Sequence, residues 1–214
     1  MIKFIFKGII RDSSKSLIPV LVITVGVMVT VLMSGFLRGV LSDIVNQNAK
    51  LDTGHLKIMT RPYAENKDQM PNDLALLDLQ DLQEDLKQKF PNVLWNPRIK
   101  FGGIIDVPDS NGNTKTQGPG LGMALAILDT TSGELERLNL KKSIQKGRLP
   151  IRKGEIVLSD AYAEKLKISP GEEITYFGTT MEGSMVFQNF VMTGTIYFGS
   201  PLLDKGTFII DIKD

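Results

Sequence analysis

The sequence predicts an α+β protein that is held to a membrane by one N-terminal helix. Residues 17–37 form an unbroken apolar run without a charge, long enough as a helix to cross a hydrocarbon layer of about 30 Å. From residue 54 onward, short apolar segments alternate with turn residues, and more of them have the two-residue period of strands than the period of helices. These observations together predict a transmembrane helix followed by a mixed α/β domain.

The charges on either side of the apolar run predict its orientation. The segment before the run contains four basic residues and one acidic residue: Lys3, Lys7, Arg11, Lys15 and Asp12. Such an excess of cations normally stays in the cytoplasm. Residues 39–214 contain 20 Lys and Arg against 23 Asp and Glu, so we expect this part to lie across the membrane.

Two other interpretations of the run fit less well. A cleaved signal peptide usually has an apolar stretch of about 7–15 residues and a small-residue cleavage site. The run is longer than that, and the sequence SGFLRGV at its end does not match a cleavage site. A helix of a soluble protein would have to be buried on all sides, and a domain of this size can hardly cover so long an apolar helix.

The segments on both sides of the run are predicted to be helical. Residues 1–16 mix apolar residues with cations, which is typical of an amphipathic elbow on the cytoplasmic membrane surface; a disordered basic start is the alternative. Beyond the run, apolar residues at helical spacing predict a rigid stalk that ends near Asn48. Its stripe needs cover from the globular domain or from another transmembrane helix. The stripe consists of Leu37, Val40, Leu41, Ile44 and Val45.

Periodicity and turn residues define the expected elements of residues 51–214. Pro91 ends an amphipathic helix, Asn-Gly at 111–112 predicts a hairpin turn, and Ser-Pro-Gly at 169–171 predicts a second tight turn. Residues 61–72, which include two prolines, are expected to form a loop. Strands or extended segments are expected at 54–59, 93–107, 115–128, 155–158, 173–178, 186–198 and 207–212, and helices at 78–90, 131–138 and 159–167, the last capped by Ser159.

The sequence contains no recognisable catalytic, cofactor or metal site. The absence of cysteine excludes disulfides and thiolate zinc sites, and His55 is the only histidine, so a histidine metal cluster is impossible. The glycines at residues 118–122 lack the Lys-Ser/Thr of a phosphate loop and are interpreted as a loop. A formal net charge of +1 gives no reason to expect nucleic acid as a partner. We expect no enzyme activity and no cofactor.

Several stretches, taken in order, resemble the permease subunits of the lipoprotein-releasing and macrolide-exporter class of ABC transporters and the related cell-division permease. After the elbow and the run come GHLKI, NPRIKFGGII and the long segment KGRLPIRKGEIVLSDAYAEKLKISPGEEITYF. FVMTGTIYFGSPLLDKGTFIID then resembles the stretch that precedes the next membrane helix of such permeases. Family members continue with three more membrane helices, so we expect this chain to be part of a longer permease.

The resemblance implies an architecture and a set of partners. The domain at 51–214 would be a two-lobed mixed α/β periplasmic core, with a βαβ-rich lobe and a β-rich insertion at about 139–190. The chain would lie in the bacterial inner membrane beside a second permease copy or paralogue, and a separate cytoplasmic ATPase would supply the energy. Lipoprotein-releasing permeases that use a periplasmic chaperone have a long hairpin where residues 176–186 stand here; this stretch is short, so chaperone capture is not expected.

The leading hypothesis is a permease subunit that transmits ATP-driven motion for lipoprotein release or export, with lipoprotein as one candidate cargo. An exporter of amphiphilic drugs or peptides and a mechanotransmission subunit acting on a cell-wall enzyme are alternatives of the same class. A single-pass anchored binding protein is an alternative of another class. The residues expected to face acyl chains or a partner helix are Met28, Val31, Leu32, Met33 and Phe36.

Overall fold

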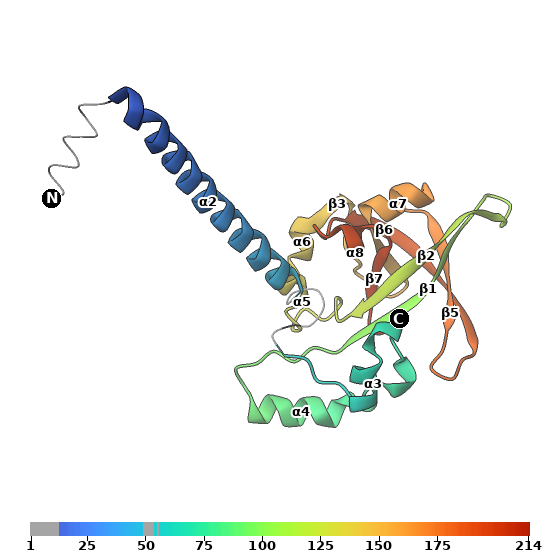
Figure 1. Ribbon diagram of the computed structural model, residues 1–214. Coiled ribbons are helices and arrows are strands. Elements are labelled where there is room, and N and C mark those ends of the chain that lie inside the picture. Colours follow the sequence, from blue (N-terminus) through green and yellow to red (C-terminus); the bar gives the residue numbers. More distant parts are fainter. Residues whose placement is uncertain (1–12, 49–53, 55) are drawn as a thin grey trace. The chain divides into compact units, whose positions relative to one another are not determined.

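A computed structural model describes residues 13–48, 54 and 56–214 of the chain (Figure 1). The chain divides into two compact units, Met1–His55 and Leu56–Asp214, which are considered separately. The first unit contains helix α2, Ser13–Asn48, which includes the apolar run and the predicted stalk. The last residues of the expected elbow, 13–16, belong to α2, and the rest of the elbow lies outside the described residues.

The second unit contains a seven-stranded sheet and several short helices. The strands are β1 (Arg98–Pro108), β2 (Thr114–Leu125), β3 (Ile144–Gly147), β4 (Glu155–Ser159), β5 (Glu173–Thr179), β6 (Met185–Ile196) and β7 (Thr207–Asp211). The helices are α3 (Arg61–Glu65), α4 (Leu79–Lys89), α5 (Glu134–Arg137), α6 (Leu140–Ser143), α7 (Asp160–Leu166) and α8 (Pro201–Asp204), with 3₁₀ turns η2 (Lys67–Gln69) and η3 (Asn72–Leu74).

The strand pairings close into a ring. The order is β3-β6-β4-β7-β2-β1-β5, and β5 pairs in addition with β6. Strand β6 makes both contacts because its first half, up to Val191, is antiparallel to β5, whereas its second half, from Val191, is parallel to β4. Strands β2 and β7 are also parallel, and the remaining pairs are antiparallel. We call this closed sheet the barrel.

Aromatic rings pack directly over glycine residues on the strands, where any side chain would collide with them. A Cβ atom on Gly103 would lie 2.2 Å from the ring of Tyr176, and one on Gly178 would lie 2.0 Å from its hydroxyl oxygen. That hydroxyl donates a hydrogen bond to the carbonyl oxygen of Gly102 at 3.0 Å. The Tyr176 ring packs edge to face on Phe101, with centroids 5.4 Å apart. Glycine is therefore required on β1 and β5 because the ring lies directly over the backbone.

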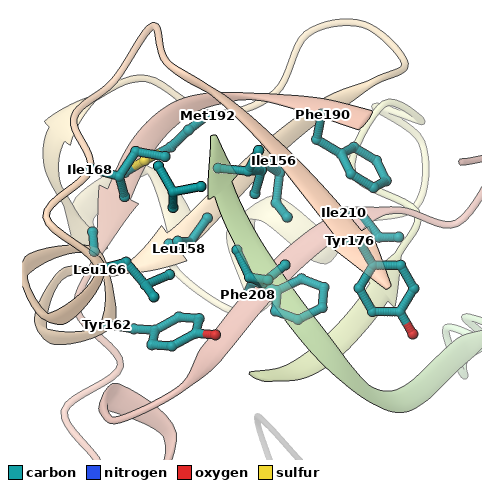
Figure 2. Packing of buried hydrophobic residues seen from close by; sticks show 14 of the residues in the cluster. Ile156, Leu158, Tyr162, Leu166, Ile168, Tyr176, Phe190, Met192, Phe208 and Ile210 are labelled. Carbon is teal, nitrogen blue, oxygen red and sulfur yellow. The ribbon is translucent and has the colours of Figure 1, made fainter. Parts of the chain in front are cut away.

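The apolar core lies inside the barrel and under α7 (Figure 2). Strands β4 and β7 are buried along their whole length, and α7 buries Tyr162 and Leu166. The Tyr162 hydroxyl donates to the Gly118 carbonyl oxygen at 2.8 Å, so this buried polar group is satisfied. Burial raises the pKa of Tyr162 to about 12. The side chains labelled in Figure 2 are Ile156, Leu158, Tyr162, Leu166, Ile168, Tyr176, Phe190, Met192, Phe208 and Ile210.

A buried carboxylate fixes the loop between β3 and β4. Glu155 is 1% exposed and accepts hydrogen bonds from both terminal nitrogens of Arg148 at 2.7 Å. It also accepts from Nε of Arg152 and from the backbone nitrogen of Ile151, each at 2.9 Å. The Arg148 guanidinium is the main cause that lowers the pKa of Glu155 to about 2. The loop from residue 148 to 152 is thus held by charge-assisted bonds in addition to the buried ring of Pro150.

Most of the predicted elements are present. Helix α4 ends at Lys89, before Pro91, and the predicted hairpin closes with Asp109 and Asn113 hydrogen-bonded at 2.7 Å. The turn at 169–171 has Gly171 at φ 102°, as its sequence predicted. The α+β class with one N-terminal apolar helix is confirmed.

Four local predictions were wrong. Residues 56–59 are irregular and not a strand, because no described strand pairs with them and the chain turns into α3 at its N-cap, Thr60. The loop expected at 61–72 instead contains α3 and two 3₁₀ turns, with a proline in the first turn of α3, where no backbone donor is needed. Residues 118–122 lie inside β2 rather than in a loop, because ring contacts favour glycine there. The hydroxyl of Ser159 does not cap α7; it donates to the Asp204 carbonyl oxygen at 2.9 Å.

Short elements near the expected insertion were not predicted. Helices α6 and α8 and strand β3 each span four residues, too few to show a period. Residues 139–190 supply β3, β4, β5 and the start of β6, and these strands join the same sheet as β1, β2 and β7. No break in the sheet therefore marks the boundary of the expected insertion.

A protein containing only residues 51–214 should fold on its own. The unit Leu56–Asp214 contains the whole buried core of the described residues, and a domain of this size buries enough surface to be stable. We expect a soluble monomer with one cooperative thermal transition, measured by circular dichroism and sedimentation. Aggregation, or a melt without a transition, would contradict this expectation.

Replacing Glu155 by Gln in that protein should lower its stability in a pH-dependent way. The Arg148 and Arg152 side chains are 47% and 73% exposed and can be rehydrated, so we expect a loss of about 2 kcal/mol, less than for a fully buried pair. Because folding lowers the pKa of Glu155 from 4.5 to about 2, its contribution is complete above pH 4.5 and disappears as the pH falls toward 2. Urea unfolding of both proteins at several pH values measures this difference; a gap that stays constant from pH 6 to pH 2.5 would refute it.

Candidate functional site

Helix α2 exposes an apolar surface on every side. Each side chain that the structure describes between residues 17 and 46 is exposed, and Leu17–Asn46 is long and apolar enough to cross a membrane. The hydroxyls of Thr24 and Thr30 donate to the carbonyl oxygens four residues earlier, Val20 and Gly26, both at 2.8 Å. The helix therefore satisfies these two polar groups internally, as a lipid environment requires.

The two sets of residues predicted to act on α2 lie on largely opposite sides of the helix. At about 100° per residue, the contact set (Met28, Val31, Leu32, Met33 and Phe36) is centred about 150° away from the stalk stripe, which begins at Leu37. All members of both sets are exposed. One straight neighbouring helix cannot cover both faces, so the two sets need different neighbours.

The most buried carboxylate of the second unit is fully enclosed by donors. Glu134 is 0% exposed and accepts from Arg98 at 2.7 Å, from Asn96 at 2.8 Å and from Arg137 at 2.9 and 3.0 Å. Burial raises the pKa of Glu134, and the Arg98 charge opposes this shift. Because both oxygens are occupied and no part is exposed, Glu134 holds the segments around Asn96 and Ser132 together and cannot reach a substrate.

Asp211 has a similar structural role at the end of β7. It is 1% exposed, and its Oδ2 accepts from the backbone nitrogens of Ile127 and Leu128 at 3.0 and 2.8 Å. Its Oδ1 accepts from the backbone nitrogen of Lys213 at 3.0 Å. The carboxylate therefore ties the chain after β2 to the end of β7, and it is not available for acid or base chemistry.

No catalytic or metal-binding constellation occurs among the residues that the structure describes. Within 13–48, 54 and 56–214, no group of three His, Cys, Asp or Glu side chains could hold a metal ion. The glycines of 118–122 lie in a strand, where they present no phosphate cradle. His55, the one histidine, lies outside the described residues.

Sequence reasoning missed both buried carboxylate clusters. The pattern of Arg148 and Arg152 seven and three residues before Glu155 could have suggested the loop-fixing cluster. No local pattern could have revealed Glu134, because Arg98 and Asn96 come from 36 and 38 residues earlier in the chain.

The MacB-like periplasmic core domain family matches residues 16–211, from the first turn of α2, just before the apolar run, to the last residue of β7. The chain belongs to this family. A comparison with curated proteins found no match. This match confirms the predicted membership of the permease class that includes the lipoprotein-releasing and macrolide-exporter permeases.

Membership assigns the chain to a family of ABC transporter permeases with a periplasmic core domain. It also supports a membrane protein, in agreement with the apolar surface of α2. The match begins at residue 16, so it leaves out the predicted elbow. The contact and stalk residues on α2 stay predictions.

Placing Arg at Val27, near the middle of the apolar run, should weaken membrane anchoring. Val27 is exposed on α2, and a cation at the centre of a membrane helix costs about 2.5–3.5 kcal/mol on the translocon scale. Carbonate washing of membranes should release a larger share of Val27→Arg than of the wild type, whereas the matched Val27→Leu change should release none. Complete retention of the Arg variant would refute the anchoring role of this run.

Proposed function

We propose that this chain is a permease subunit that transmits ATP-driven motion to its periplasmic domain for lipoprotein release or export. The observation that best supports this function is the family match over 16–211, which includes both an apolar helix and the barrel. The energy would come from a separate cytoplasmic ATPase, and the described residues of this chain offer fixed structural carboxylates instead of reactive ones.

The proposed topology follows from charge. The N-terminus lies in the cytoplasm of a bacterial cell, on the side that retains the basic segment before residue 17. The domain from residue 56 onward is periplasmic, and the elbow at 1–16 contacts the cytoplasmic membrane surface beside the ATPase. The lipid bilayer is accordingly a permanent partner of α2.

The division of α2 into two faces supports a division of roles. Contact residues such as Met28 and Phe36 face acyl chains, or a helix of a second permease copy or paralogue. Stalk residues such as Ile44 continue the same helix without a break. A continuous helix transmits rotation and tilt because its hydrogen bonds resist bending, so the backbone of the stalk matters more than any one side chain.

A helix breaker in the stalk should therefore uncouple the transporter. Ile44→Pro removes a backbone donor and costs about 3 kcal/mol or more within a helix, whereas Ile44→Ala keeps the helix and removes only the exposed side chain. In the complex of permease and ATPase in liposomes, we expect the Ile44→Pro permease to insert normally. The ATPase should still hydrolyse ATP, whereas transport should fall at least tenfold. Release of a fluorescent lipoprotein and phosphate production are measured together.

The control for this experiment is Asn46→Ala, which changes an exposed polar residue of the same turn and should leave both rates nearly unchanged. Normal transport by Ile44→Pro would show that the stalk is a passive tether. That result would favour the anchored binding-protein alternative.

A further inference from the structure

An exposed row of apolar side chains crosses four neighbouring strands of the barrel. Pro119 of β2 pairs with Ile104 of β1, Ile104 pairs with Phe177 of β5, and Phe177 pairs with Phe187 of β6. Directly paired residues point to the same face of a sheet. All four are exposed, and Phe187 is 71% exposed. We call Pro119, Ile104, Phe177 and Phe187 the apolar row.

The apolar row lies on the outside of the barrel. The next residue on β1, Ile105, is 0% exposed, and Tyr176 on β5 points into the core (Figure 2). Since side chains alternate along a strand, their neighbours in the row point outward. Met185, diagonal to Phe177 on the same face, is 84% exposed and extends the apolar surface. A contiguous exposed surface of this kind is a common feature of interaction sites.

A polar row runs beside the apolar row on the same face. Two residues farther along the strands, Asp106 pairs with Gln117 and with Thr175, and Thr175 pairs with Asn189. The Thr175 hydroxyl donates to Oδ1 of Asn189 at 3.0 Å. Oδ1 of Asp106 is buried and has no hydrogen-bond partner among the residues that the structure describes. This acceptor, next to Ile104, lacks the donor that a buried carboxylate oxygen normally has.

The charges near the β5 and β6 end of the apolar row are negative. Residues 168–204 contain no Lys, Arg or His, but include Glu172, Glu173 and Glu182. At the other end of the row, Lys115 lies on β2, and the exposed Lys205 precedes Gly206, whose carbonyl oxygen accepts a hydrogen bond from the Leu121 backbone nitrogen, two residues from Pro119. The potential at the β5 and β6 end therefore attracts cations and repels anionic surfaces.

We propose that the apolar row and Asp106 form a docking surface for a partner polypeptide segment with apolar side chains beside a Lys or Arg. The apolar side chains would cover the row, and the cation would pair with the charge of the half-buried Asp106 carboxylate. An anionic bilayer has the wrong sign of charge for this face. In a symmetric pair of copies, Asp106 and the glutamates of one barrel would face those of the other. This inference goes beyond the proposed transport function and does not depend on it.

Binding of a defined peptide to the full chain tests the proposal. The chain is placed in phosphatidylcholine nanodiscs, and a fluorescein-labelled peptide of alternating Leu and Lys is titrated by anisotropy, with empty nanodiscs to subtract lipid binding. We expect saturable binding, no binding of the matched Leu/Glu peptide, and an affinity at least about tenfold lower for Phe187→Ser, since exposed aromatic anchors dominate such contacts. Asp106→Asn should weaken binding about threefold or more, because it removes the charge that faces the cation.

Two matched variants separate a specific site from general stickiness. Leu202→Ser removes an 85% exposed apolar side chain from α8 and should leave the affinity unchanged. Phe187→Leu keeps an apolar side chain and should retain most of the binding, which also shows that the barrel tolerates change at this position.

Four results would overturn the proposal. The first is no saturable binding of the Leu/Lys peptide. The second is equal affinity for the wild type, Phe187→Ser and Asp106→Asn. The third is flotation of the nanodiscs with phosphatidylglycerol vesicles, abolished by Phe187→Ser, which would assign the row to a lipid surface. The fourth is self-association in sedimentation experiments, likewise abolished by Phe187→Ser, which would assign it to a second copy.

Discussion

The barrel depends on one strand that is shared between two neighbours. Strand β6 leaves β5 and joins β4 at Val191, the residue that pairs with both Glu173 and Glu155. This single crossing converts an open sheet into a ring that includes the β5–β1 pair. Because the sheet is closed, β1, β5 and β6 have one face toward the core and one outer face. Closure also removes most of the unpaired strand edges that would otherwise invite aggregation.

Charge-assisted bonds help to hold the short helices and the loop at the edge of the domain. Helices α5 and α6 span four residues each, too few to be stable alone, and the segment from residue 148 to 152 has no regular structure. Glu134 and Glu155 each collect two arginines across these segments. Such clusters stabilise less than apolar packing of the same volume would, because the charges must lose water. Their directional bonds define one arrangement for these short segments.

Features that depend on neighbouring residues in the sequence could be predicted, and features that depend on contacts with distant segments could not. The length of α2, the Asn-Gly hairpin and the Pro-Gly turn follow from their own sequences and agree with the structure. The strand expected at 56–59 failed because alternation describes a side-chain pattern and cannot show whether a neighbouring strand exists. The glycines of β2 were misjudged because the rings that need them, such as Phe101, come from another strand. The faces of α2 could be predicted as patterns, but a pattern does not identify what covers each face.

The surface of α2 and the apolar row are both exposed and apolar, but each needs a partner of different chemistry to cover it. The surface of α2 surrounds the helix and is interrupted by no charge between residues 17 and 37, so only a medium that is apolar on all sides, such as hydrocarbon, can solvate it. The apolar row occupies one face of a sheet whose other side is the protein core, and it borders Asp106 and acidic loops. Hydrocarbon would leave that carboxylate without a donor. A polypeptide can offer apolar and cationic groups within a few ångströms of each other. Although both surfaces expose apolar side chains, the surface of α2 therefore suits lipid and the apolar row suits a polypeptide.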